Sequence, residues 1–189
     1  MGYVVDQKSQ INSELGLMMP RLKAFAAALT ANEAAIQSLG KATRNHILAR
    51  MAKERGHTPV TLWAFAQMYK IWAARMKSAP DDAAPVDPRL FQPRSRANDG
   101  GASARFARSL AQLAPQQRAT LHLVYGERLS YDEVAEIFGQ PVSAIVTRLA
   151  KCHAVLGQSE ERDRGAQASE RIETRHLPEA GATGQGRAA

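Results

Sequence analysis

Small, hydroxylated and cationic side chains recur on one side of the segment that follows Pro141. They are Ser143, Ala144, Thr147, Arg148 and Lys151. Small residues allow a helix to approach a duplex closely, and Arg or Lys can donate hydrogen bonds to guanine edges or bind phosphates. The residue types and their spacing therefore favour a recognition helix that lies in the major groove of DNA.

The same segment carries apolar residues at helical spacing on its other side. They are Val142, Ile145, Leu149, Cys152 and Leu156, which recur at alternating steps of three and four residues. This period predicts a helix with one buried stripe, so the cationic side chains would face outward. An ordinary helical hairpin with a solvated cationic face would show the same period, and the period alone does not separate the two interpretations.

A second, shorter helix is predicted directly before this one. Ser130 followed by Glu133 forms a capping box, so the helix should begin at Tyr131. Gly139 should end it, because glycine adopts the left-handed conformation at little cost, and Pro141 suits the start of the next helix. Two helices joined by a tight turn form a helix-turn-helix.

Residues 110–156 resemble region 4 of the extracytoplasmic-function sigma factors, of the sigma-70 family, along their whole length. The matching residues are Leu113-Ala114-Pro115, Arg118, Leu129-Ser130-Tyr131, Glu133, Ala135, Glu136, Gly139, Pro141-Val142 and Arg148-Leu149. The resemblance implies a domain that contacts the −35 promoter element through its last helix and RNA polymerase through the β-flap.

The helical N-terminal half resembles region 2 of the same family, with departures. Residues 18–35 are similar to the family's opening helix, and Thr58-Pro59 with Trp63 and Phe65 fits the segment before the promoter-melting helix. The acidic cluster that the family uses to bind the β′ clamp is missing from residues 35–42. Where the family tends to have Asn and Asp for reading the −10 element, this chain has Lys70 and Ala74.

A basic face on the same predicted helix is formed by Lys70, Arg75 and Lys77. Together with the resemblance, it predicts that these residues hold the DNA of the −10 region. An Asn side chain can form hydrogen bonds to the edge of a base, whereas a Lys ammonium in its place favours an ionic contact with a phosphate. A solvated cationic face is the alternative interpretation.

The predicted fold class is all-α, with two helical domains joined by a flexible linker. We expect a region 2-like domain at 15–78, a linker rich in Pro, Gly and Asp at 79–102, a region 4-like helix-turn-helix domain at 103–157, and a disordered tail at 158–189. Residues 159–174 could instead continue the last helix. Pro20 is predicted to lie in the first turn of the first helix.

Composition narrows the class of partner. The chain has 189 residues and a formal net charge of +7, which favours polyanions such as nucleic acid or anionic lipid as partners.

The single cysteine and the five histidines show no metal-ligand spacing, and no catalytic motif is recognisable. We therefore expect no enzyme activity, metal or cofactor. Because neither a signal peptide nor an apolar membrane span is evident, we expect a cytoplasmic protein without a membrane partner.

Two functions from different classes follow. The first is a sigma factor that directs RNA polymerase to specific promoters, with promoter DNA, the core polymerase (β-flap and β′ clamp) and an anti-sigma factor as partners. The alternative is a sigma-shaped regulatory protein that does not itself initiate transcription, either as a decoy for an anti-sigma factor or as a DNA-bound regulator. A conventional helix-turn-helix repressor, which would bind a palindrome as a dimer, is a third possibility.

Overall fold

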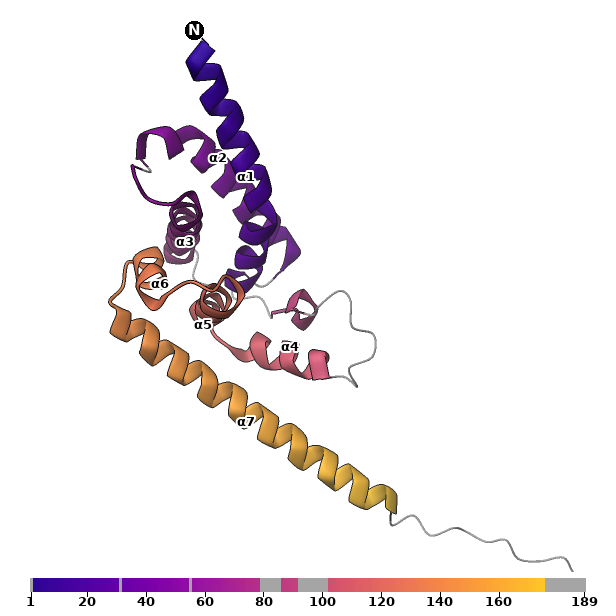
Figure 1. Cartoon of the computed structure of the whole chain (residues 1–189). Helices are drawn as coiled ribbons and strands as arrows, with labels where there is room; N and C mark the ends of the chain where they lie inside the picture. The colour runs from indigo at the N-terminus through magenta and orange to yellow at the C-terminus, as the bar shows by residue number, and fades with distance from the viewer. Residues whose placement is uncertain (1, 31, 55, 79–85, 92–101, 176–189) are drawn as a thin grey trace, which may run out of the picture.

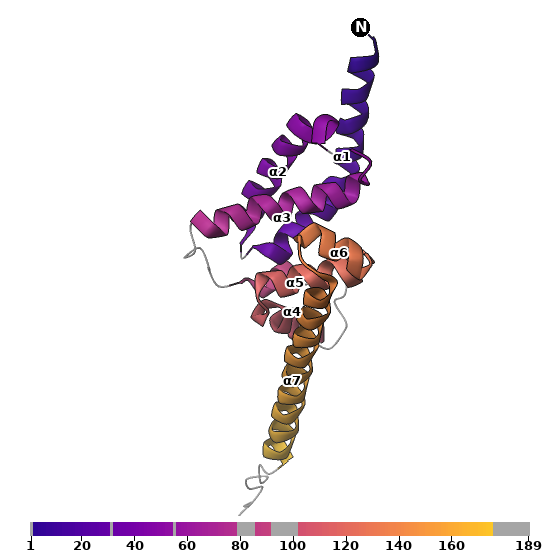
Figure 2. The same ribbon diagram turned by 90° about the vertical axis from the view of Figure 1, so that its left-hand side faces the viewer.

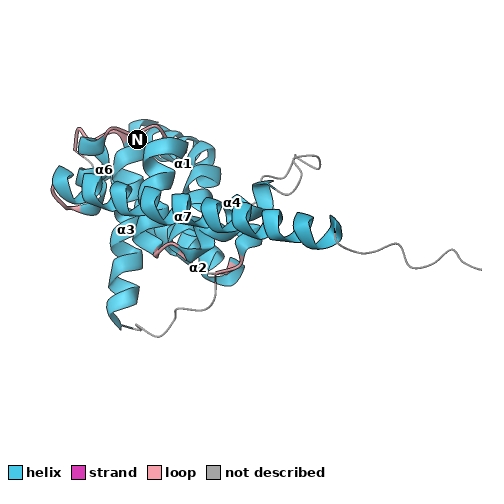
Figure 3. Cartoon of the chain, turned by 90° about the horizontal axis from the view of Figure 1, so that it is seen from below, coloured by secondary structure: helices cyan, strands magenta, loops and turns pink. Residues whose placement is uncertain are grey.

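The described part of the chain contains helices joined by loops, and no strand (Figure 3). A computed structural model describes residues 2–30, 32–54, 56–78, 86–91 and 102–175. The elements are α1 (Gly2–Leu29), α2 (Glu33–Glu54), α3 (Val60–Ser78), the 3₁₀ turn η1 (Pro88–Phe91), α4 (Ala102–Gln112), α5 (Pro115–Leu121), the π-helical turn η2 (His122–Gly126), α6 (Tyr131–Phe138) and α7 (Val142–Arg175). The predicted all-α class is confirmed.

The N-terminal half consists of α1, α2 and α3, which pack on one another (Figure 1). Asn32 caps α2, since its Oδ1 accepts a hydrogen bond of 2.8 Å from the backbone N–H of Ala35. Gly56, with a φ of +57°, lies in the turn that follows α2. The rings of Phe25 and Phe65 meet edge to face at 5.1 Å between centroids and fill the centre of this half.

The prediction for Pro20 is wrong. This residue lies inside α1, which begins at Gly2 and continues to Leu29. A proline inside a helix removes one backbone hydrogen bond and leaves the carbonyl four residues earlier without its donor. Pro20 and Gly16 are both exposed here, so water can reach that carbonyl.

The C-terminal half contains α4 to α7 and the predicted helix-turn-helix. The Ser130 hydroxyl accepts from the backbone N–H of Glu133 at 3.2 Å, and the backbone N–H of Ser130 donates to the Glu133 carboxylate at 2.7 Å. Gly139 ends α6 in the left-handed conformation, at a φ of +61°. The structure therefore contains both the capping box and the turn expected from the sequence.

The last helix is longer than predicted. α7 continues to Arg175 and extends beyond the other helices (Figures 1 and 2), so residues 158–175 are helical here, as in the alternative in which 159–174 continue the last helix. This stretch is rich in Glu, Arg, Ala and Gln, which are good helix formers even where they cannot bury apolar surface. The rest of the predicted tail, 176–189, lies outside the described residues.

The two halves pack directly on each other. α1 contacts α5, and α3 contacts α6, as Figure 2 shows for the second pair. The ring of Phe25 stacks on His122 at 6.0 Å, and that of Tyr69 meets Phe138 edge to face at 4.6 Å. Buried residues of both halves form one continuous hydrophobic cluster. Most of the predicted linker, 79–85 and 92–101, lies outside the described residues.

Candidate nucleic-acid interface

The first half of α7 has one buried and one exposed face. Ile145, Leu149 and Cys152 are buried against α5 and α6, which confirms the centre of the predicted apolar stripe. Thr147 and Lys151 are exposed on the opposite side. The helix thus presents the predicted polar and cationic side to its surroundings.

A groove of about 480 Å³ lies between the start of α5 and the first turns of α7. Its lining includes all five residues predicted in the C-terminal half: Ser143, Ala144, Thr147, Arg148 and Lys151. Gln116 and Gln117, from the first turn of α5, line its other side. Side-chain amides can pair with the donor and acceptor edge of adenine. These two glutamines were not identified from the sequence, where their only signal was their place directly after Pro115.

Arg148 differs from the other four because its guanidinium is directed inward. One terminal nitrogen, Nη1, donates to the Thr120 hydroxyl at 3.2 Å, and the other, Nη2, donates to the Gln140 amide oxygen. The guanidinium also lies 5.0 Å from the ring centroid of Phe138, a cation–π contact. Arg148 therefore packs α7 against α5 and α6, while Lys151 presents its charge outward.

The residues predicted in the N-terminal half form no site with this groove. Lys70 and Lys77 are exposed on α3, but Arg75 donates to the Ser38 hydroxyl at 3.3 Å and so joins α3 to α2. Lys70 lines a separate cavity of about 300 Å³, into which Glu136 of α6 also projects. The structure brings together the C-terminal set only.

Arg118, one of the residues that carry the resemblance to sigma region 4, is buried and joins two helices. Its side chain is 3 % exposed, and Nε donates to the carbonyl of Ala28 at 2.9 Å while Nη1 donates to the carbonyl of Leu113. Burial lowers the pKa of Arg118 to about 10. The residue fastens α5 to the C-terminal end of α1.

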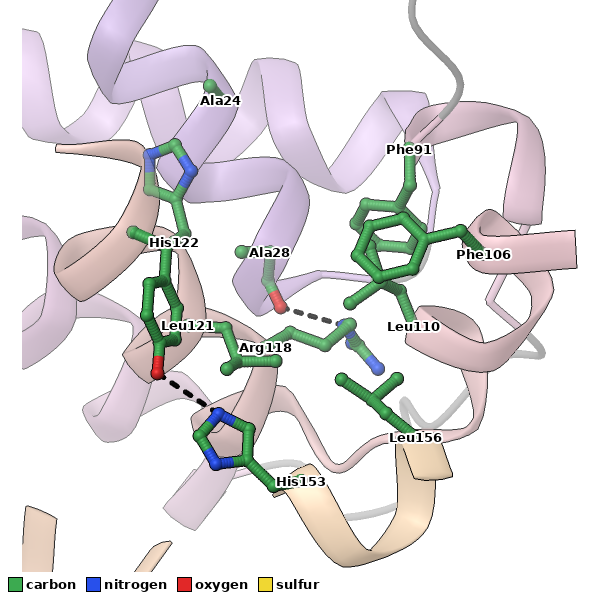
Figure 4. A pocket seen from close by; sticks show the side chains of 11 residues that line it. Ala24, Ala28, Phe91, Phe106, Leu110, Arg118, Leu121, His122, His153 and Leu156 are labelled. Atoms are coloured by element: carbon green, nitrogen blue, oxygen red, sulfur yellow. Dashed lines mark hydrogen bonds between the residues drawn. The ribbon is translucent and has the colours of Figure 1, made fainter. Parts of the chain in front are cut away.

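The same guanidinium borders a separate apolar cavity of about 330 Å³ (Figure 4). Phe91, Phe106 and Leu110 form much of its wall. The apolar lining offers few hydrogen-bond donors for phosphate, which distinguishes this cavity from the groove beside α7.

Among the described residues, neither the lone cysteine nor a cluster of metal ligands provides a second candidate site. Cys152 lies on the buried face of α7, and burial raises the pKa of its thiol. Within the described ranges, no group of three or more His, Cys, Asp or Glu residues could hold a metal ion. None of the described helices combines the length and apolar character needed to cross a bilayer.

These observations define an all-helical protein whose helix-turn-helix presents a polar and cationic helix face. Residues 103–151 match the family described as "Sigma-70, region 4". The chain is also similar to a solved structure described as the "Co-crystal structure of the sigma factor RpoE in complex with the anti-sigma factor NepR from Bartonella quintana". That match has a TM-score of 0.67 and 20 % identity, and covers 80 % of this chain and 97 % of the other. No curated protein sequence matches.

Residues 103–151 are thus similar to sigma-70 region 4, and the chain as a whole shares the fold of the sigma factor in that structure. The resemblance identified from the residues of the C-terminal half is confirmed.

Proposed function

We propose that this chain is a sigma factor of the extracytoplasmic-function type, which directs RNA polymerase to specific promoters in the cytoplasm without itself catalysing a reaction. The observation that carries the proposal is the groove beside α7. Within a region 4 domain, it gathers five residues that the sequence singled out for DNA binding and adds two glutamines. This is the chemistry of base and phosphate contact rather than of catalysis.

In this proposal, α7 lies in the major groove of the −35 element. Thr147 and Ser143 contact base edges or phosphates, and the exposed ammonium of Lys151 binds phosphate. Gln116 and Gln117 contribute further hydrogen bonds from α5. Arg148 contributes to base reading only if its guanidinium leaves the Thr120 and Gln140 side chains.

The N-terminal half supports a less specific contact with DNA of the −10 region through Lys70 and Lys77, both exposed on α3. The third predicted residue, Arg75, would first have to leave Ser38. The core polymerase is the proposed protein partner through its β-flap and β′ clamp. An anti-sigma factor is a second proposed partner, because the similar structure is a sigma factor in complex with one.

A sigma-shaped regulator that does not initiate transcription is the second candidate. One observation favours it: residues 35–42 of α2 contain no carboxylate. A basic clamp surface would find fewer ion pairs there, which weakens encounter and orientation.

Transcription in vitro tests the proposal. The purified chain is added to core polymerase with promoter fragments selected by binding from genomic DNA. Initiation that requires the chain supports a sigma factor. Specific DNA binding without initiation or a stable complex with core polymerase supports the regulator instead.

Lys151→Ala is the matched site variant, and Lys41→Ala, an exposed lysine on α2, is its control. Removing a phosphate contact should weaken binding about equally on all sequences and lower the slope of log affinity against log salt by about 1. Lys41→Ala should leave both unchanged. Equal effects of the two substitutions would show that the groove beside α7 does not receive DNA.

A further inference from the structure

The apolar cavity of about 330 Å³ in Figure 4 has room for a small organic molecule. Binding pockets for small molecules begin at about 300 Å³, and an engineered apolar cavity of about 150 Å³ in another protein holds one benzene molecule. A molecule with two fused rings therefore fits the available space. The cavity shares no lining residue with the groove beside α7, so the two are separate sites.

Aromatic side chains from different elements form much of the cavity wall. Phe91 comes from η1, Phe106 from α4 and Tyr125 from η2. Phe106 is 54 % exposed and Tyr125 is 56 % exposed, so neither ring is used to fill the core of the protein. Aromatic rings pack favourably edge to face or offset against another ring. These walls therefore favour a flat aromatic guest.

A buried positive charge lies among these apolar walls. In Figure 4 the Arg118 side chain lies between Phe91 and Leu110 on one side and His122 and His153 on the other. Arg118 is 3 % exposed, and its hydrogen bonds, from Nε and Nη1, end on backbone carbonyls. Across the ranges that the structure describes, no carboxylate forms an ion pair with this guanidinium.

The unpaired charge of Arg118 indicates the chemistry of the missing partner. Buried charges in proteins are normally paired, and a guanidinium has five N–H donors, of which the carbonyls of Ala28 and Leu113 use two. The donors of Nη2 suit a carboxylate, the group that guanidinium pairs with most favourably. An anion there would also offset the desolvation that lowers the pKa of Arg118 to about 10.

The backbone beside the cavity has two unusual features. η2 is a π-helical turn, closed by a hydrogen bond of 2.9 Å from the N–H of Glu127 to the carbonyl of His122, and it carries the lining residues His122 and Tyr125. Arg128, shortly after this turn, has a φ of +57°, which is uncommon for a residue other than glycine. Both features occur preferentially at functional sites, so their position supports a binding role for the cavity.

We propose that this cavity binds a small aromatic carboxylate, whose rings lie between Phe91 and Phe106 and whose carboxylate accepts hydrogen bonds from Arg118. The cavity offers a second polar group, because the Tyr125 hydroxyl and Nε2 of His153 form a hydrogen bond of 3.0 Å beside it. Apolar walls with a few well-placed polar groups are typical of specific small-molecule pockets. This site goes beyond the proposed function and does not depend on DNA binding.

Titration of the full chain with 2-naphthoate and 2-naphthamide tests the proposal. The two probes share one ring system, but only 2-naphthoate is an anion at neutral pH. Isothermal titration calorimetry should give 2-naphthoate a Kd of about 1 mM or lower, as expected for a ligand of this size. The Kd of 2-naphthamide should be at least about tenfold higher, because charge-assisted hydrogen bonds are about twice as strong as neutral ones. Equal affinities would refute the anion site, and no binding of either probe would refute the pocket.

Two variants locate the bound probes. Ala24 is an exposed residue of α1 that lines the cavity, so Ala24→Phe should raise the Kd of both probes at least about tenfold by occupying space that they need. Ala34→Phe is the matched control, because it makes the same change at an exposed position of α2 that does not line the cavity. If Ala24→Phe binds both probes as the wild type does, they bind elsewhere and the proposal fails.

Arg118→Met separates binding by the guanidinium from its role in holding α5. The variant keeps an apolar stem, so 2-naphthamide should still bind, which verifies that the cavity is intact. The preference for 2-naphthoate should disappear, because no charged donor remains at this position. A preference that persists would place the carboxylate elsewhere and overturn the assignment of Arg118. The wild-type comparison and Ala24→Phe decide the proposal even if this variant is too unstable to measure.

Discussion

Replacing Arg118 by Met should lower the free energy of unfolding by about 1 to 2 kcal/mol. Methionine keeps an unbranched stem of similar length but removes the guanidinium and its donors. The carbonyls of Ala28 and Leu113 then lose their partners in a buried environment. Hydrogen bonds from a charged donor contribute about 1.5 to 3 kcal/mol each, so the two together are worth about 3 to 6 kcal/mol.

An opposing effect reduces this loss. Burial lowers the pKa of Arg118 from its ordinary value to about 10, which corresponds to a cost of about 3 kcal/mol for keeping the charge in the interior, at 1.36 kcal/mol per pKa unit. Methionine carries no such cost. The difference between the two effects gives the small net loss expected for Arg118→Met.

Arg118→Lys should destabilise the protein at least as much as Arg118→Met. Lysine keeps the buried charge but presents a single ammonium in place of the planar guanidinium fork, which here reaches two carbonyls on different elements. Urea unfolding followed by circular dichroism measures all three proteins, with comparison of the m-values to confirm that the same transition is observed. If Arg118→Lys is as stable as wild type, the two-carbonyl geometry does not hold α5 in place.

Three further changes test local features of the fold. Ser130→Ala should lower the free energy of unfolding by about 1 kcal/mol because it removes the capping box. Gly139→Ala should lower it by about 1 kcal/mol because the φ of this residue is positive. Urea midpoints measure both changes, and an unchanged midpoint would contradict the cap at Ser130 or the turn at Gly139. Burial lowers the pKa of His122, chiefly by desolvation and against the pull of Glu127, so the folded state binds its proton less readily than the unfolded state. Stability should therefore be constant above the ordinary pKa of 6.5 and fall as the pH decreases below it. His122→Gln should show a smaller loss between about pH 7.5 and about pH 5.5 than wild type, and an unchanged loss would assign the pH dependence to other groups.

The features that the sequence predicted well depend on residues close together in the chain. The capping box spans Ser130 to Glu133, and the turn at Gly139 needs only its own backbone conformation. The buried stripe of α7 follows from a period that repeats within one helix. Such signals survive in any context that allows the helices to form, so the helix-turn-helix and its exposed face could be predicted.

The direction of the Arg148 side chain could not be predicted in the same way. Its Thr120 partner lies 28 residues earlier in the chain. No local pattern encodes such a pair, because it depends on how α5, α6 and α7 pack. The two glutamines of the groove were missed for the same reason.

α5 shows why the two halves cannot be understood separately. It has only seven residues, from Pro115 to Leu121, and a helix this short is not stable in isolation. On one side Arg118 binds the carbonyl of Ala28 in the last turn of α1, where a positive charge also interacts favourably with the helix dipole. On the other side Gln116 and Gln117 line the groove beside α7. The shape of the proposed DNA-binding surface therefore depends on contacts with the N-terminal half, and separation of the halves must change the groove as well as the distance between them.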